Sequence, residues 1–206
     1  VDDFGQALAD YTGAKYGVAV SSGTAALHLS VVSLGLGPGD EVITTPMTFC
    51  ATANSVLYQG ANIKFVDIDP KTLNINPNLI EQNITEHTKA IIPVDFRGHP
   101  ANLKEIKEIS ERYNLKIIED GSHSIGSTYK EGGETYFCGD GIHADLCTYS
   151  FHPVKHITTG EGGAILTNNE KLYKKISLLL KHGIIRRVWT KMEKVPAEGA
   201  KKEDQT

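Results

Sequence analysis

Short apolar runs alternate with amphipathic runs along most of this chain, and that alternation constrains the fold more than any other feature. The apolar runs have the length of strands, and the amphipathic runs have the helical period of about 3.6 residues. Strands that alternate with helices are joined by crossovers, which place neighbouring strands parallel. Seven strands are predicted, at residues 17–20, 41–45, 64–68, 90–94, 116–118, 146–151 and 164–167. The predicted fold class is therefore α/β, a mostly parallel seven-stranded sheet with helices on both faces.

Helices are predicted between these strands. They occupy residues 24–34, 48–58, 77–84, 103–113 and 170–182. In the fourth of them, Leu103, Ile106 and Ile109 fall on one face, as in a helix that packs on a sheet. Open α/β sheets bind ligands at the carboxyl ends of their strands. Functional residues are accordingly expected where a strand ends and the chain turns.

Charge and cysteine content narrow the class of function. The 21 basic and 25 acidic side chains give a net charge of -4 without a basic stripe, which argues against nucleic acid and anionic membranes as partners. No apolar run reaches the roughly 20 residues that cross a bilayer. Cys50, Cys138 and Cys147 are an odd number in a chain too long for a disulfide scaffold, so a reducing, cytoplasmic location is expected. Small-molecule chemistry fits these properties best.

The first candidate site follows the strand at residues 17–20. Residues 22–25 place a glycine, hydroxyls and free backbone N–H groups at a helix N-terminus, an arrangement that binds phosphate. The same residues are also typical of an ordinary Ser or Thr helix cap. Taken alone, this motif favours the cap.

Two further candidates follow later strands. Asp120 ends an apolar strand, where a carboxylate either holds a heteroaromatic nitrogen protonated or binds nearby backbone N–H groups. Lys155 follows a strand end that carries the Ser150 hydroxyl, a partly desolvated place where the pKa of an amine falls and a Schiff base becomes possible. Most lysines, however, are solvated surface residues. The glycines of residues 160–163 are interpreted as a tight turn and not as a ligand site.

A metal site and a dinucleotide site are the alternatives. Potential soft metal ligands occur in one stretch, at Cys138, His143, Cys147 and His152. Neither a CxxC nor a HExxH pair is present, so no metal is predicted. Acidic residues follow several predicted strands, at Asp67, Asp69 and Asp95. Because no glycine-rich fingerprint precedes them, the sequence argues against NAD.

Four motifs stand in order along the chain: residues 22–27 (SGTAAL), 48–54 (TFCATAN), 119–123 (EDGSH) and 150–163 (SFHPVKHITTGEGG). Together they resemble the DegT/DnrJ/EryC1/StrS aminotransferases, from about residue 4 to Gly183. Within that family the resemblance is strongest to the pseudaminic-acid pathway enzymes, which aminate UDP-linked 4-keto-6-deoxy-N-acetylhexosamines. It implies the large domain of a fold type I enzyme that depends on pyridoxal 5'-phosphate (PLP), at residues 1–184.

The resemblance also implies roles for individual residues. Lys155 would carry PLP as a Schiff base and move a proton during catalysis. Asp120 would keep the pyridinium nitrogen protonated, and His123 would lie near the phenolic oxygen of the cofactor. Phe49 would stack on the ring. The implied residues around the phosphate are Gly23, Thr24, Ala25 and Ser150.

The implied reaction has two halves: glutamate leaves its amino group on PLP, and a nucleotide-linked keto sugar then receives it. One branch of the family instead dehydrates sugars and has histidine at the lysine position. Lys155 occupies that position here and His156 follows it, so transamination is predicted. A catalytically inactive fragment or scaffold is the alternative from another class.

The resemblance implies a longer protein than this chain. An N-terminal segment and a small C-terminal domain are expected outside it, and the full-length protein is expected to be a homodimer with active sites at the interface. Residues 185–206 do not resemble the family and have too little apolar content to pack, so a disordered tail is predicted there. Gly121 and Ser122 stand where many relatives carry alanines, and little effect is expected.

Overall fold

The structure is a computed structural model that describes residues 1–184. In chain order its elements are α1 (Asp2–Thr12), β1 (Tyr16–Val20), α2 (Gly23–Leu34), β2 (Glu41–Thr44), α3 (Cys50–Leu57), β3 (Asn62–Phe65), α4 (Pro77–Ile80), η1 (Glu81–Asn83), β4 (Thr88–Ile92), η2 (Phe96–Gly98), α5 (Leu103–Tyr113), β5 (Lys116–Asp120), β6 (Thr128–Glu131), β7 (Glu134–Phe137), β8 (Leu146–Ser150), β9 (Gly163–Thr167) and α6 (Glu170–Leu180). The tail predicted at residues 185–206 lies outside the described residues. Within residues 1–184, no helix has the length and apolar character needed to cross a membrane.

Seven strands form one sheet, in the order β1-β9-β8-β5-β4-β2-β3. The pairs from β8 through β5, β4 and β2 to β3 are parallel, whereas β9 is antiparallel to both β8 and β1. The direction changes at β9 because residues 151–162 connect β8 to β9 as a loop, without the helix of a parallel crossover. The predicted mostly parallel seven-stranded sheet is confirmed.

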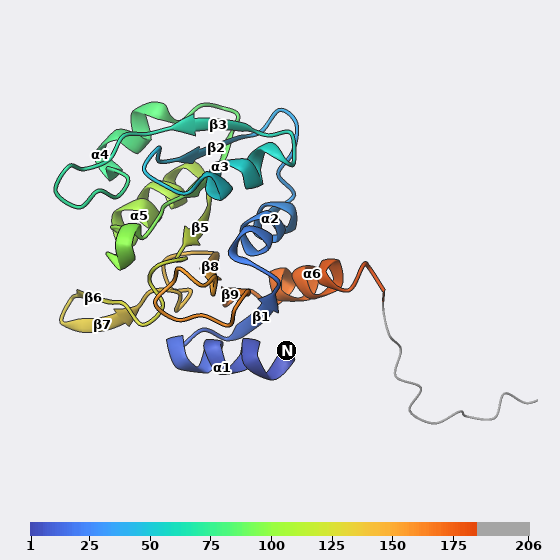
Figure 1. The fold of residues 1–206 in the computed structure, drawn as a ribbon. Helices are drawn as coiled ribbons and strands as arrows, with labels where there is room; N and C mark the ends of the chain where they lie inside the picture. The colour runs from blue at the N-terminus through green and yellow to red at the C-terminus, as the bar shows by residue number, and fades with distance from the viewer. Residues whose placement is uncertain (185–206) are drawn as a thin grey trace, which may run out of the picture.

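Helices cover both faces of this sheet (Figure 1), and the alternation of side chains along each strand divides the core between the faces. On β5, Ile118 packs in a cluster with residues of α2, α3 and α6, whereas Ile117 packs in a second cluster with residues of α5. On β8, Tyr149 packs against α1 in a third cluster. Consecutive residues of β5 therefore point into different surroundings.

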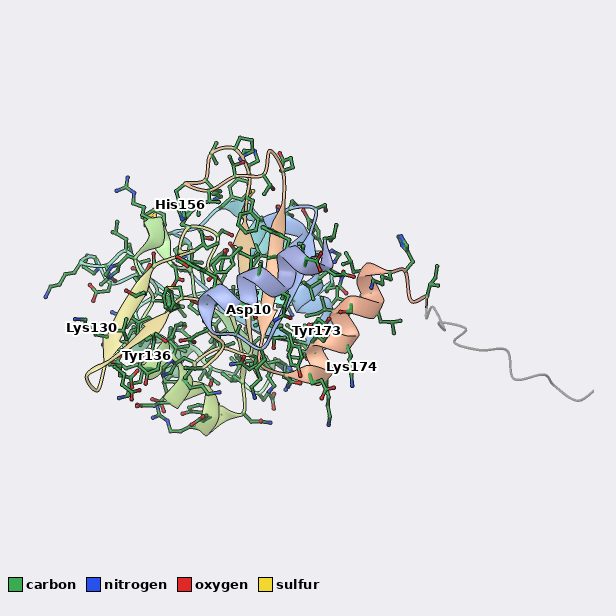
Figure 2. The ribbon with its side chains drawn as sticks, turned by 90° about the horizontal axis from the view of Figure 1, so that it is seen from below. Asp10, Lys130, Tyr136, His156, Tyr173 and Lys174 are labelled. Atoms are coloured by element: carbon green, nitrogen blue, oxygen red, sulfur yellow. The ribbon has the colours of Figure 1, made fainter. Side chains whose placement is uncertain are left out.

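The sequence pattern does not predict α1, the β6–β7 hairpin or η2. α1 buries mainly small residues of its inner face, including Gly5 and Ala9, so its apolar stripe is weak. β6 and β7 form a separate two-stranded hairpin whose turn contains Gly132 and Gly133, both at positive φ. A Gly-Gly pair between two strand-forming runs is a hairpin signal that could have identified this element. Figure 2 shows Lys130 and Tyr136 on the hairpin, on the opposite side of the ribbon from Tyr173 and Lys174 of α6.

Most predicted elements differ from the observed ones only at their ends. β3 begins at Asn62 and β4 at Thr88, each earlier than predicted. Both residues are polar, and both pair with Glu41 at the start of β2. The hydrogen-bonded ladder thus extends past the apolar residues from which these strands were predicted.

Candidate active site

A cavity of about 450 Å³ lies at the carboxyl ends of the parallel strands. Its walls come from the segments that follow β1, β2, β4, β5 and β8. Every residue with a predicted catalytic or cofactor role lines this cavity, except Ala25. Those that line it are Gly23, Thr24, Phe49, Asp120, His123, Ser150 and Lys155. Segments that are distant in the sequence therefore converge on one space.

The N-terminus of α2 forms one end of the cavity. Ser22 caps this helix, because the Ala25 N–H donates to Ser22 Oγ at 3.1 Å. The Ala25 N–H is thus engaged within the cap. Gly23 and Thr24 are the first residues of α2, and N–H groups at these positions have no acceptor inside a helix. The cap therefore leaves the N–H groups of Gly23 and Thr24 available to a ligand in the cavity.

Gly23 allows this helix end to lie directly against the end of β8. A Cβ atom on Gly23 would lie 2.6 Å from Ser150 Cβ, so no larger residue fits without a backbone shift. Gly163 approaches the carbonyl of Ser22 in the same way. The close contact brings the buried Ser150 hydroxyl to the helix end that carries the free N–H groups.

Asp120 ends β5 in the middle of the sheet and is 4% exposed. Its Oδ1 accepts the Ser122 N–H at 3.2 Å, and its Oδ2 accepts the Thr52 hydroxyl at 2.7 Å. The Thr52 hydroxyl lies 2.7 Å from that of Thr48, and since Thr52 donates to Asp120, Thr48 donates to Thr52. Each carboxylate oxygen has a further lone pair, so Asp120 is oriented by these bonds and still able to bind a cationic nitrogen.

Lys155 lies in the loop between β8 and β9 and is half-buried. Its N–H donates to the His152 carbonyl at 2.9 Å, which forms a turn. Burial lowers the pKa of the Lys155 amine, and the nearby Asp120 carboxylate partly opposes this shift. A lowered pKa increases the neutral fraction of the amine, the form that acts as a nucleophile.

His156, which follows Lys155 directly, does not line the cavity. Its Nε2 lies 3.0 Å from the Ile125 carbonyl, on the side of the loop that faces the segment after β5. The loop is held by further bonds, including the Thr158 hydroxyl to the Phe151 carbonyl at 2.8 Å. The structure therefore presents Lys155, and not His156, to the cavity.

His123 and Phe49 line the cavity in different ways. His123 is partly buried, and its Nδ1 is enclosed without a hydrogen-bond partner among the described residues. Burial and the neighbouring Lys155 lower the pKa of His123, and Asp120 opposes them. Phe49 is the N-cap residue of α3 and is 69% exposed, which is unusual for a large aromatic side chain. One polar group lacks a partner and one apolar group lacks cover, as expected where a ligand binds.

The soft metal ligands in the sequence do not gather in one place. His143 bonds to Tyr129 at 2.7 Å and contacts Glu131 at 3.3 Å, while His152 is exposed and lies 3.7 Å from Glu161. Within residues 1–184, the close group of metal-ligating side chains is Asp95, Glu119 and Cys138. Of the four candidate ligands Cys138, His143, Cys147 and His152, this group contains only Cys138. Gly160 has a positive φ of 82°, which agrees with its interpretation as a turn residue.

Several lining residues were given no catalytic or cofactor role from the sequence. They are Ser22, Leu27, Thr48, Ala51, Thr52, Val94, Phe96, Ser122, His152, Val154 and Glu161. Thr52 matters most, because it binds the buried carboxylate of Asp120 directly. Thr48 and Thr52 both lie in the TFCATAN motif, and hydroxyls four residues apart at a helix start were the signal that could have found them.

Comparison with known proteins agrees with this geometry. The sequence profile of the DegT/DnrJ/EryC1/StrS aminotransferase family matches residues 1–201. The chain is 44% identical over 189 residues to a GDP-perosamine synthase of Caulobacter vibrioides. This match covers 91% of the chain and 49% of the relative. The chain is 43% identical over 193 residues to the UDP-4-amino-4,6-dideoxy-N-acetyl-beta-L-altrosamine transaminase of Campylobacter jejuni, covering 92% and 49% respectively.

The fold is likewise shared with solved structures. The crystal structure of NtdA from Bacillus subtilis with the bound cofactor PMP matches at a TM-score of 0.78 and 40% identity, covering 86% of this chain and 39% of that chain. The chain spans about half the length of the curated relatives it matches.

Proposed function

The chain belongs to the DegT/DnrJ/EryC1/StrS aminotransferase family, and we propose that it forms the PLP-binding part of an enzyme that transfers an amino group from glutamate to a nucleotide-linked keto sugar. The observation that carries this proposal is the composition of the cavity. An anion-binding helix end, a buried carboxylate and a half-buried amine with a lowered pKa line one space of about 450 Å³. This set of groups is complementary to a phosphate, a pyridine nitrogen and an aldehyde.

Three residues fit the phosphate end of PLP. Gly23 and Thr24 offer backbone N–H groups at the start of α2, and Ser150 offers a hydroxyl beside them. Because Gly23 is in contact with Ser150, a side chain at Gly23 would occupy the space between helix and strand. We assign the phosphate to this end of the cavity.

The remaining residues fit the ring. Asp120, held by Thr52 and Ser122, would bind the ring nitrogen and keep it protonated. Phe49 would cover one face of the ring, and the open Nδ1 of His123 would bind the phenolic oxygen. When bound, PLP supplies an electron sink and a carrier for the amino group.

Lys155 has two tasks in this proposal. As a neutral amine, Nζ would hold the cofactor covalently by condensing with its aldehyde group, with loss of water. Once an amino donor has displaced it, Nζ would accept the proton from the substrate carbon and deliver it to the cofactor carbon to which it had been attached. Burial serves both tasks, because it lowers the pKa of Lys155 toward neutrality.

For the sugar, the proposal extends to a UDP-linked 4-keto-6-deoxy-N-acetylhexosamine. The transaminase from Campylobacter jejuni supports this choice, since its name gives a 4-amino-4,6-dideoxy sugar on UDP. Sugar dehydration on the same scaffold is the second candidate, and the position of the residues disfavours it. Lys155 faces the cavity, while His156 contacts the Ile125 carbonyl.

The proposal includes a homodimer of the whole protein in the reducing cytoplasm. Large apolar side chains outside the cavity lining, Leu57 and Tyr58 among them, are exposed and suited to a partner surface. The three cysteines are free, which fits a reducing compartment. Sedimentation velocity of the whole protein tests the dimer.

The cofactor proposal is tested by spectroscopy of the purified chain with PLP. We expect a visible absorbance band that borohydride abolishes, and a reduced PLP adduct on the tryptic peptide that contains Lys155. Lys155→Ala should show neither, whereas His156→Ala should show both. Folded wild-type protein without band or adduct would refute the proposal. Loaded protein that yields no 2-oxoglutarate from glutamate would support the inactive scaffold for this chain.

A further inference from the structure

A second acidic site lies on the other face of β5, behind the cavity. Glu119 precedes Asp120 and points to the opposite side of the sheet, where Asp95 and Cys138 meet it. One ligand atom of each of these three side chains lies within 4.8 Å of the others. Asp95 is 0% exposed and Glu119 is 1% exposed, so water does not reach either carboxyl group.

The hydrogen bonds in this cluster leave one oxygen open. Asp95 Oδ1 accepts the Ala101 N–H at 2.8 Å, and Asp95 Oδ2 accepts the Ser124 hydroxyl at 2.6 Å. Glu119 Oε2 accepts the Gly139 N–H at 3.1 Å. Glu119 Oε1 is buried and has no partner among the described residues. Buried carboxylate oxygens normally accept a hydrogen bond, and this one has no donor.

No cation compensates the two acids in the described part of the chain. The groups that face Glu119 are all acids, thiols or phenols: Asp95, Asp140, Cys138, Tyr129 and, from β8, Cys147 and Tyr149. The Cys138 thiol also faces Asp95. Burial and the Asp95 carboxylate raise the pKa of Glu119 well above its ordinary value. Burial also raises the pKa of Asp95, but the bonds from Ser124 and Ala101 oppose that rise. Two charged carboxylates this close and this buried are not stable together.

Either a proton or a metal ion could relieve this repulsion, and the number of available ligand atoms favours a proton. A metal ion needs about four ligands with free lone pairs directed at one point. Only three such atoms, one each from Asp95, Glu119 and Cys138, lie together among the described residues, whereas the lone pair that remains on each Asp95 oxygen is enough to accept one proton. A single proton on Glu119 Oε1, donated to Asp95, satisfies the one open atom.

We propose that Glu119 keeps its proton at neutral pH and donates it to Asp95, and that this acid pair positions the turn carrying Asp120 and His123. The second half rests on the proposed function. Asp95 acts through its neighbours: its N–H donates to the Asp120 carbonyl at 3.1 Å, and Ser124, which bonds to its Oδ2, closes the turn with the Gly121 carbonyl. Asp95 and Glu119 are positioning residues, since neither touches the cavity.

The proton is tested by unfolding the chain in urea without cofactor, as wild type and as Glu119→Gln. The sign follows from linkage: the unfolded state loses the Glu119 proton above the ordinary value of 4.5, and the folded state keeps it, so wild-type stability falls as pH rises through this window. Glutamine carries an N–H₂ group in place of the acidic proton, so the stability of Glu119→Gln does not fall in this way as pH rises. The ratio of the folding constants, Glu119→Gln over wild type, should therefore rise by up to about tenfold per pH unit. A ratio that stays constant or falls with pH would overturn the proposal.

The two acids should also respond unequally to amide substitution. Asp95→Asn must turn an N–H₂ toward the Ala101 N–H or the Ser124 hydroxyl, so it should weaken PLP binding several-fold, and Ser124→Ala should do the same. Glu119→Gln should bind PLP like wild type. Equal losses for Glu119→Gln and Asp95→Asn, or stoichiometric metal in the purified protein, would overturn the acid pair. Failure of wild type to bind PLP would refute the proposed function and leave the unfolding result unaffected.

Discussion

Glu119 and Asp120 are neighbours on β5, yet the structure places them in opposite surroundings. Asp120 lines the cavity, where Thr52 and Ser122 orient it and spare lone pairs remain for a ligand. Glu119 lies in a closed cluster with Asp95, where a single oxygen lacks a partner. The two-residue alternation of a strand, and not the type of side chain, thus decides which acid is available for chemistry.

The two faces also differ in what their polar groups lack. On the cavity face, the unmatched groups are donors and acceptors of different kinds, spread over several segments: N–H groups of α2, the Lys155 amine and His123 Nδ1. On the buried face, one proton satisfies the cluster. The cavity face therefore suits a ligand with several polar groups, whereas the buried face suits a proton.

The largest effect is expected from Lys155→Ala on the cavity face. The nucleophilic amine is removed, so covalent attachment of PLP should vanish, and transamination should fall by roughly 10²–10⁴-fold or more. In wild type, attachment should strengthen as pH rises through the pKa of Lys155, because only the neutral amine reacts; the lowered pKa places this rise below that of an exposed lysine. Absorbance titrations with PLP at several pH values measure both effects. His156→Ala is the matched control, and its loss of the band would contradict the assignment of Lys155.

The same chemical change on the two acids of β5 sharpens the comparison. Asp120→Asn removes the charge proposed to bind the ring nitrogen and turns an N–H₂ toward the Thr52 or Ser122 donor, so PLP affinity should fall by about 10- to 150-fold, equivalent to about 1.5–3 kcal/mol. Glu119→Gln should leave that affinity unchanged. Equilibrium dialysis with PLP distinguishes the two variants, and equal affinities would break the comparison.

Gly121, directly after these acids, tests how tightly the buried face is packed. A Cβ on Gly121 would lie 2.9 Å from Cys147 Sγ, 2.9 Å from Ser124 Oγ and 3.0 Å from Tyr149 Cε1. Gly121→Ala should therefore cost about 1–3 kcal/mol of unfolding free energy, more than its small size suggests from sequence. Ser122→Ala, on the cavity side, should change stability by less than about 0.5 kcal/mol. Urea unfolding of both variants measures the difference, and similar midpoints would show that the buried face adapts.

The sequence predicted the sheet and the cavity residues with proposed cofactor roles for different reasons. Strong apolar runs identified all seven strands, and the SGTAAL, EDGSH and SFHPVKHITTGEGG motifs identified residues of the cavity. Contacts across the fold were not predictable: Thr52 and Asp120 are 68 residues apart, and nothing local joins them. The contact between Asp95 and Glu119 was not predictable either, because Asp95 follows β4 and Glu119 lies on β5. α1 escaped prediction because it packs with small residues.

The smallest effects are expected where the cavity face is supported indirectly, through Thr52 and Thr48. Thr52→Val removes the donor to Asp120 Oδ2 with little change in shape, and should lower PLP affinity by roughly tenfold, equivalent to about 1.5 kcal/mol for a bond to a charged group. Thr48→Val removes a neutral bond one step further away, and should cost about 1 kcal/mol or less. In the double variant the two losses should not add, because Thr48 acts only through Thr52. Additive losses in PLP titrations would mean that Thr48, which also lines the cavity, contacts the ligand itself.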